Sequence, residues 1–243
     1  MNNDKAKSVR KLCQRKNSKI CLSLDIPNWD NFFNILEKVA DKIVMLKLHL
    51  DIMENLDKTH LEKLFQMKKQ YKFFVWEDRK LCDIGHTNSL VVKQLLSYQF
   101  NNGENLIDFV SILPIGGELS LTPLFDLDIG IFLLSEMSSQ DNYFNDIITN
   151  NIIQLSKTHY RTGKITGIIN QTLNPYTIQY PMLSIMPGIS HLSDKDTMGQ
   201  QYRDVTKLKV LPDIFVVGRA IYQSENPLES INQLLRKIKL AEK

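Results

Sequence analysis

Short apolar runs alternate along the chain with longer polar segments in which apolar residues recur every three or four positions. The runs are rich in branched and aromatic residues, as is typical of buried strands, and the spacing in the longer segments predicts amphipathic helices. The predicted strands lie at residues 20–26, 42–50, 72–80, 106–114, 129–137, 164–170, 182–189 and 213–221. The clearest helical segments lie at residues 28–40, 58–71, 88–100, 145–160 and 227–242.

Eight strands that alternate with helices predict an α/β fold, a (β/α)8 TIM barrel with a parallel sheet covered by helices. An open, doubly wound sheet is the competing arrangement. Its glycine-rich phosphate-binding turn after the first strand is absent, because residues 25–30 read DIPNWD. We therefore expect a single barrel domain over residues 1–243, with residues 1–19 as an N-terminal helical extension. The weakest unit is segment 171–181, which is too short and too rich in proline for a full helix.

The composition is that of an ordinary soluble globular protein. Of the 243 residues, 43% are hydrophobic and 23% are charged, so the chain can bury a large core. The formal charge of +3 is small and is not gathered into one basic block. This balance argues against nucleic acid as a partner and is compatible with a small anionic ligand.

Three cysteines, Cys13, Cys21 and Cys82, form no CxxC pair. They fit small apolar residues in a reduced compartment better than a disulfide framework. The basic N-terminus lacks the apolar core of a signal peptide, and no run approaches the roughly 18 residues of a membrane span. A cytoplasmic protein with no membrane partner is expected.

Charged residues gather where the predicted strands end, which is the edge that carries catalytic groups in barrels of this kind. Asp78 and Lys80 are two residues apart on one strand, so both side chains leave the same face, and Lys47 and His49 are spaced likewise on another. Glu77 and Arg79 point the other way and are expected to be structural. The expected array of alternating charges consists of Asp25, Lys47, Asp78, Lys80 and Asp83.

Such an array has an ordinary alternative, because ion pairs at a solvated strand end are common and contribute only about 0–1 kcal/mol each. A buried array instead requires each charge to be compensated, and the alternating signs supply that compensation. Asp83 stands at the start of the next predicted helix, with Thr87 one turn beyond it on the same face.

A second candidate feature is GQQY at 199–202, followed by the last predicted strand. Gly218 and Arg219 close that strand, where barrels commonly bind phosphate with backbone N–H groups and a cation. A strand end with a surface arginine is the alternative.

Together these motifs resemble the orotidine 5′-phosphate decarboxylase family in its fungal and animal form. The matching segments are CLSLD (21–25), LKLHLDI (46–52), EDRKLCDIGHT (77–87), EMS (136–138), PG at 187–188 with GQQY at 199–202, and DIFVVGRAI (213–221). The DxKxxD array is shared with sugar-phosphate decarboxylases of the same superfamily, whereas its combination with GQQY and VGR is more specific.

The resemblance implies decarboxylation of orotidine 5′-phosphate to UMP, without a cofactor or metal, in pyrimidine biosynthesis. It implies a catalytic tetrad of Lys47, Asp78, Lys80 and Asp83, with Lys80 as the proton donor. Asp83 and Thr87 would reach the site of a partner subunit, so a homodimer with shared sites is expected. The substrate-binding residues that it implies are Asp25, Lys47, His49 and Thr87 at the ribose; Ser138 and Gln200 at the pyrimidine; Gln200, Tyr202, Gly218 and Arg219 at the phosphate; and Pro187 in the loop before GQQY.

The chain departs from the family pattern at several positions. The family usually has threonine at Leu48, asparagine at His86, and threonine at Met186. It usually has Asn-Ala-His where residues 111–113 read Ser-Ile-Leu, with Leu113 at the histidine position. None of these changes removes a charged residue of the tetrad or the expected phosphate contacts.

Two alternatives stay open. The first is a sugar-phosphate decarboxylase or aldolase of the same superfamily, typically dependent on magnesium and therefore sensitive to chelators. The second is a catalytically silent barrel that binds nucleotide or another pyrimidine enzyme, which would release no carbon dioxide from orotidine 5′-phosphate.

Overall fold

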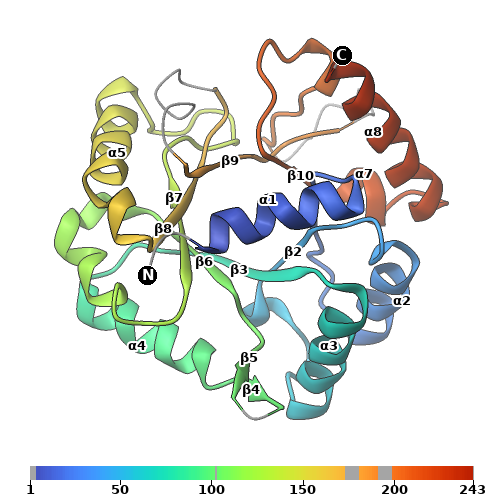
Figure 1. Cartoon of the computed structure of the whole chain (residues 1–243), viewed down its shortest axis with the longest axis horizontal. Helices are drawn as coiled ribbons and strands as arrows, with labels where there is room; N and C mark the ends of the chain where they lie inside the picture. Colours follow the sequence, from blue (N-terminus) through green and yellow to red (C-terminus); the bar gives the residue numbers. More distant parts are fainter. Residues whose placement is uncertain (1–3, 102, 173–180, 191–198, 243) are drawn as a thin grey trace.

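Eight parallel strands close into a barrel surrounded by helices (Figure 1), in a computed structural model that describes residues 4–101, 103–172, 181–190 and 199–242. The strands are β1 (Ile20–Ser23), β2 (Met45–Leu48), β3 (Phe74–Leu81), β6 (Phe109–Ile112), β7 (Gly130–Leu134), β8 (Ile165–Ile169), β9 (Leu183–Met186) and β10 (Ile214–Val217). Each lies largely or wholly within one of the eight predicted runs, and β1 pairs with β10 to close the ring. The barrel prediction is confirmed, and the open sheet is wrong.

Four of the five long helices that follow the strands begin where the sequence supplies a capping side chain, and α4 (Gly85–Leu96), which follows Ile84, has no such cap. The other four are α2 (Trp29–Val39), α3 (Lys58–Tyr71), α5 (Asp146–His159) and α8 (Pro227–Ala241). Asn28, Asp57, Asn145 and Asn226 each precede a helix and accept a hydrogen bond from the backbone N–H three residues later. Each cap satisfies a backbone donor that the first helical turn leaves without a partner.

Some boundaries differ from the prediction. The helical segment 88–100 ends at Leu96, and the following residues form a small hairpin of β4 (Gln99–Phe100) and β5 (Glu104–Asn105). After β6 the chain forms three short 3-10 turns, η2 (Pro114–Gly116), η3 (Glu118–Ser120) and η4 (Thr122–Leu124), because prolines and adjacent glycines interrupt this stretch. The last strand ends at Val217, so Arg219 begins the short helix α7 (Arg219–Tyr222). Most of segment 171–181 lies outside the described residues.

The N-terminal helix α1 (Asp4–Lys16) lies across the barrel in Figure 1. Its buried Ala6, Val9 and Leu12 belong to the same apolar cluster as the residues inside the barrel. Arg10 donates hydrogen bonds to Asp213 and to the carbonyl of Met182, which ties the helix to the strand starts. The helix thereby covers the end of the barrel opposite the carboxyl ends of the strands.

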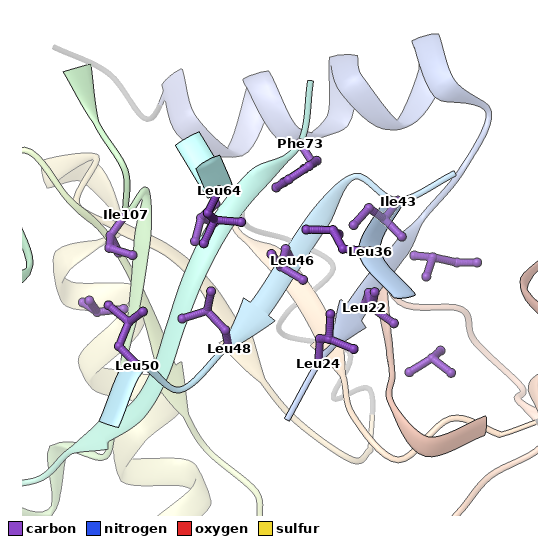
Figure 2. Packing of buried hydrophobic residues seen from close by; sticks show 14 of the residues in the cluster. Leu22, Leu24, Leu36, Ile43, Leu46, Leu48, Leu50, Leu64, Phe73 and Ile107 are labelled. Carbon is purple, nitrogen blue, oxygen red and sulfur yellow. The ribbon is translucent and has the colours of Figure 1, made fainter. Parts of the chain in front are cut away.

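Two apolar layers follow from the alternation of side chains along each strand. Leu22, Leu46 and Leu48 face outward and pack with Leu36 and Leu64 of the surrounding helices (Figure 2). The alternate positions face inward, among them Cys21, Met45, Trp76, Phe109 and Phe132. Near the carboxyl end of a strand, a polar residue two positions after an inward-facing residue must therefore project into the barrel mouth. Within the described residues, no helix combines the length and apolar character needed to cross a membrane.

Candidate active site

A cavity of about 190 Å³ opens at the carboxyl ends of the strands. Ten of the predicted site residues line it: Asp25, Lys47, Asp78, Lys80, Ser138, Pro187, Gln200, Tyr202, Gly218 and Arg219. They come from six of the eight strand ends or the loops that follow them, at β1, β2, β3, β7, β9 and β10, so barrel closure brings them together.

Asp78 is the centre of the charged array. Its Oδ2 atom lies 2.8 Å from Nζ of Lys47 and 2.6 Å from Nζ of Lys80, and its side chain is only 4% exposed. Lys47 is two residues after the inward-facing Met45 on β2, and Asp78 and Lys80 are two and four residues after the inward-facing Trp76 on β3. All three side chains therefore point into the barrel mouth. The pairing of β3 with β6 shifts register between Glu77 and Leu81, an irregularity of the kind that re-aims side chains near active sites.

The charges in this array are mutually compensated. Burial alone would raise the pKa of Asp78, but the Lys47 and Lys80 ammonium groups hold it well below its usual range. Burial would likewise lower the pKa of Lys47, but Asp78 and Asp25 raise it above the ordinary value. For Lys80 burial prevails and lowers the pKa, although Asp78 opposes this. Carboxylates beside Lys80 therefore offset only part of the effect of burial.

Asp25 forms a second polar group beside this array. Its Oδ1 accepts a hydrogen bond from Nδ1 of His49 at 2.8 Å, and its Oδ2 accepts one from Ser23 at 3.1 Å. Burial raises the pKa of Asp25, but the hydrogen bond from His49 and the charge of Lys47 outweigh it and lower the value to about 2. Nε2 of His49 lies 3.9 Å from Asp78, so His49 stands between the two carboxylates.

The segments around Ser138 and Gln200 are held together by backbone pairing. The Ser138 hydroxyl donates to Oε1 of Gln200 at 3.2 Å, and the Gln201 N–H donates to the Ser138 carbonyl. Gly188 has φ +78°, and a Cβ there would come within 2.4 Å of the Gln201 carbonyl oxygen. A glycine is thus required at position 188 for the chain there to approach the backbone of Gln201 this closely.

Arg219 supplies the cationic group expected at a phosphate, and it also lines the cavity. The guanidinium carbon of Arg219 lies 5.6 Å from the ring centre of Tyr202, a cation–π arrangement. Gly218 precedes Arg219, and a Cβ there would approach the Ser23 carbonyl oxygen to 3.2 Å. Arg219, Tyr202 and the backbone at Gly218 thus converge on one part of the cavity wall.

Asp83 and Thr87 are not brought into this cavity. Asp83 is exposed, and its carboxylate accepts a hydrogen bond from the backbone N–H of Ile84 at 2.7 Å. Thr87 is half-buried on α4. Within one chain the charged array therefore consists of Asp25, Lys47, Asp78 and Lys80.

Glu77 and Arg79 point away from the barrel interior, as their spacing predicted. The buried Glu77 carboxylate accepts hydrogen bonds from the backbone N–H groups of Leu50 and Arg79 at 2.9 and 3.1 Å. Arg79 pairs with Asp51 at 2.5 Å. Both residues therefore support the loop after β2.

Several cavity residues were missed by the sequence reasoning. Trp76, Leu134, Met137 and Tyr222 line the cavity, and the buried Ser111 contacts Asp78 from beneath. The sequence feature that could have indicated Ser111 is its position two residues after Phe109, which faces inward. An isolated serine within an apolar strand does not reveal this contact without the neighbouring strand.

The departures from the family pattern lie outside the cavity lining. Leu48 and Met186 are buried in the cluster that includes the surrounding helices, and Leu113 packs against it. His86 is exposed on α4.

The sequence matches the model of the family described as "Orotidine 5′-phosphate decarboxylase / HUMPS family" over residues 18–234. Orotidine 5′-phosphate decarboxylase of Schizosaccharomyces pombe is 28% identical, with 94% of this chain and 86% of the relative covered. Uridine 5′-monophosphate synthase of Bos taurus is 27% identical over 93% of this chain and 46% of the relative.

Solved structures share the fold. Orotidine 5′-monophosphate decarboxylase of Methanocaldococcus jannaschii, complexed with the inhibitor BMP, superposes with a TM-score of 0.68 at 24% identity, covering 91% of this chain and 98% of that one. Orotidine 5′-phosphate decarboxylase of Pyrococcus horikoshii gives a TM-score of 0.66 at 22% identity, covering 90% and 99%.

Proposed function

The chain belongs to the orotidine 5′-phosphate decarboxylase / HUMPS family, and from this premise we propose that it converts orotidine 5′-phosphate to UMP and carbon dioxide. The observation that carries the proposal is the compensated Lys47–Asp78–Lys80 array in the barrel mouth, which shares one cavity with Arg219 and Tyr202. The names of the curated relatives point to the same reaction.

The proposed chemistry uses Lys80 as an acid. The bond between the pyrimidine ring carbon and the carboxylate breaks, carbon dioxide leaves, and the electron pair stays on the ring carbon. The ammonium of Lys80 stabilises this negative charge and then transfers a proton to the carbon. Neutral Lys80 regains its proton from solvent. Fixed charges replace electron delocalisation here, because no ring carbonyl is placed to accept the electron pair.

Asp78 has two roles in this proposal. It holds both ammonium groups through one oxygen, which fixes the direction of Lys80. Its negative charge would also lie beside the substrate carboxylate and repel it more in the ground state than in the transition state, where charge moves into the ring. Lys47 compensates the buried carboxylate, since a buried charge without a partner costs several kcal/mol.

The phosphate would bind at Arg219, Tyr202 and the backbone of Gly218. A guanidinium provides two parallel hydrogen bonds to a phosphate, which orient the nucleotide and also contribute to its binding free energy. Ser138 and Gln200 would bind the pyrimidine, because hydroxyl and amide groups match the donors and acceptors of its edge. Asp25 and His49 would accept and donate hydrogen bonds at the ribose, and Pro187 would contact the ligand from the cavity wall.

We also propose a homodimer in which each subunit supplies Asp83 and Thr87 to the other's site. Asp83 is exposed and outside the cavity of its own chain, whereas Lys80 opens toward the mouth. Around Asp83 the surface is apolar, since Ile84 is 67% exposed and Leu119, on the adjacent turn, is 79% exposed. An apolar surface of this kind is typical of subunit contacts. The unpaired thiols Cys13, Cys21 and Cys82 fit the cytoplasmic location included in this proposal.

The test is turnover by the purified protein. Loss of the substrate's ultraviolet absorbance, with equal amounts of UMP and carbon dioxide formed, is the expected result, and it should persist in excess chelator. A protein that binds UMP but leaves orotidine 5′-phosphate intact would refute the enzymatic proposal.

A further inference from the structure

Beneath the charged array lies a hydrogen-bonded chain that no sequence motif indicates. Ser111 is on β6 with 0% of its surface exposed. Its hydroxyl oxygen lies 2.9 Å from Nε1 of Trp76 and 2.5 Å from Oδ1 of Asp78. The two neighbours are alternate inward-facing residues of β3, so one serine on the adjacent strand spans both.

The direction of this chain is fixed by chemistry. The indole N–H can only donate, so the Ser111 oxygen must accept from Trp76. The Asp78 carboxylate is ionised beside two lysines and can only accept. The single proton of Ser111 must therefore point at Oδ1 of Asp78.

The two carboxylate oxygens of Asp78 consequently accept hydrogen bonds from different donors. Oδ2 accepts from both lysines, and Oδ1 accepts from Ser111. Rotation of the carboxylate would break bonds at both oxygens, so Ser111 fixes the orientation in which Lys80 is held. The Trp76 ring is itself packed edge-on against Phe132 at 5.0 Å, which gives Ser111 a rigid anchor.

We propose that Ser111, held by Trp76, is a positioning residue that orients Asp78 and through it Lys80 for the decarboxylation. This inference rests on the proposed function for its kinetic consequence. Ser111 does not line the cavity and would act through Asp78. In the family that the chain resembles, asparagine usually occupies this position, so a hydroxyl here replaces an amide.

The kinetic test compares Ser111→Ala with the wild-type enzyme. Loss of one hydrogen bond to a buried carboxylate should lower kcat about 10- to 100-fold. The KM should change by less than about threefold, because the ligand-contacting groups remain. Ser156→Ala is the matched control, since Ser156 is equally buried but donates to a carbonyl of its own helix.

Two further substitutions distinguish the effect of losing the hydroxyl donor from the effect of changing the side-chain volume. Ser111→Thr keeps the donor and should retain more activity than Ser111→Cys, whose thiol donates weakly. If the wild-type enzyme turns over and Ser111→Ala keeps its kcat within about twofold, this inference is overturned while the proposed function stands. Equal losses in the Thr and Cys variants would also overturn it.

A spectroscopic test is independent of turnover. The chain has two tryptophans, and Trp29 Nε1 has no hydrogen-bond partner among the described residues. Asp78→Asn and Ser111→Ala should each shift the Trp76 indole N–H resonance in a nitrogen–proton correlation spectrum, and the Trp29 resonance should stay in place. An unmoved Trp76 resonance in both variants would refute the chain of hydrogen bonds even in a protein with no decarboxylase activity.

Discussion

The ammonium nitrogen of Lys80 lies 2.6 Å from Oδ2 of Asp78, two residues before it on the same strand. Both side chains face inward because the side-chain period of a strand is two, and the long Lys80 side chain then reaches back to the carboxylate. Lys47 reaches the same oxygen from the adjacent strand, so one carboxylate orients two cations.

Replacing Lys80 by alanine should lower kcat by about 10²- to 10⁴-fold, because the variant lacks the proposed proton donor. Binding of UMP should persist, since the phosphate contacts remain. Arg79→Ala is the control on the same strand, where the side chain pairs with Asp51 outside the cavity. Steady-state kinetics measures kcat, and titration with UMP measures binding, for each of the two variants. A loss as large in Arg79→Ala would point to damage of the fold instead.

Arg219→Ala should lower kcat/KM for orotidine 5′-phosphate by about 10- to 150-fold, the effect of losing a charge-assisted contact to phosphate. Slow turnover of orotidine, which lacks the phosphate, should be unchanged. Arg236→Ala removes a surface cation that pairs with Glu229 and should have no effect. Equal losses with both substrates would contradict a phosphate role for Arg219.

Lys80→Ala and Asp83→Ala should each be inactive alone but active when mixed. In a mixed dimer one site receives intact Lys80 from one subunit and intact Asp83 from the other. Random exchange should therefore restore about a quarter of wild-type activity. The measurement is activity after refolding the variants together, with each variant refolded alone as control. No recovery, with dimers formed, would refute a shared site.

Asp25 should make stability depend on pH in the acid range. Its folded-state pKa of about 2 lies below the ordinary 3.8, so its stabilising contribution is complete above about pH 4 and is lost as the pH falls toward 2. The difference in melting temperature between wild type and Asp25→Asn should shrink from pH 5 to pH 2.5. A constant difference across this range would show that the charge of Asp25 does not stabilise the fold.

Glu77→Ala should destabilise the protein by about 1–3 kcal/mol, because it leaves the buried N–H group of Leu50 and the partly buried N–H group of Arg79 without this acceptor. Denaturant unfolding measures this change. The exposed Glu62 of α3 provides the control, and Glu62→Ala should change stability by less than about 0.5 kcal/mol. Similar losses in both variants would argue against a structural role for the Glu77 hydrogen bonds.

The sequence by itself determined the barrel and much of its mouth. Apolar runs of strand length separated by helical spacing are local patterns, and eight of them fit few other folds. The spacing of Asp78 and Lys80 placed both on one face, and Glu77 and Arg79 on the other. These predictions succeeded because the period of a strand is set by its own backbone.

Only the tertiary structure decided which residues meet across strands. Lys47 reaches Asp78 because Lys47 is paired in register with Trp76, and Ser111 reaches Asp78 because β6 lies beside β3. The tertiary structure also leaves Asp83 outside the cavity of its own chain, although Asp83 is only three residues from Lys80 in the sequence. Register, strand adjacency and barrel closure depend on contacts between distant segments, and no local pattern of residues specifies them.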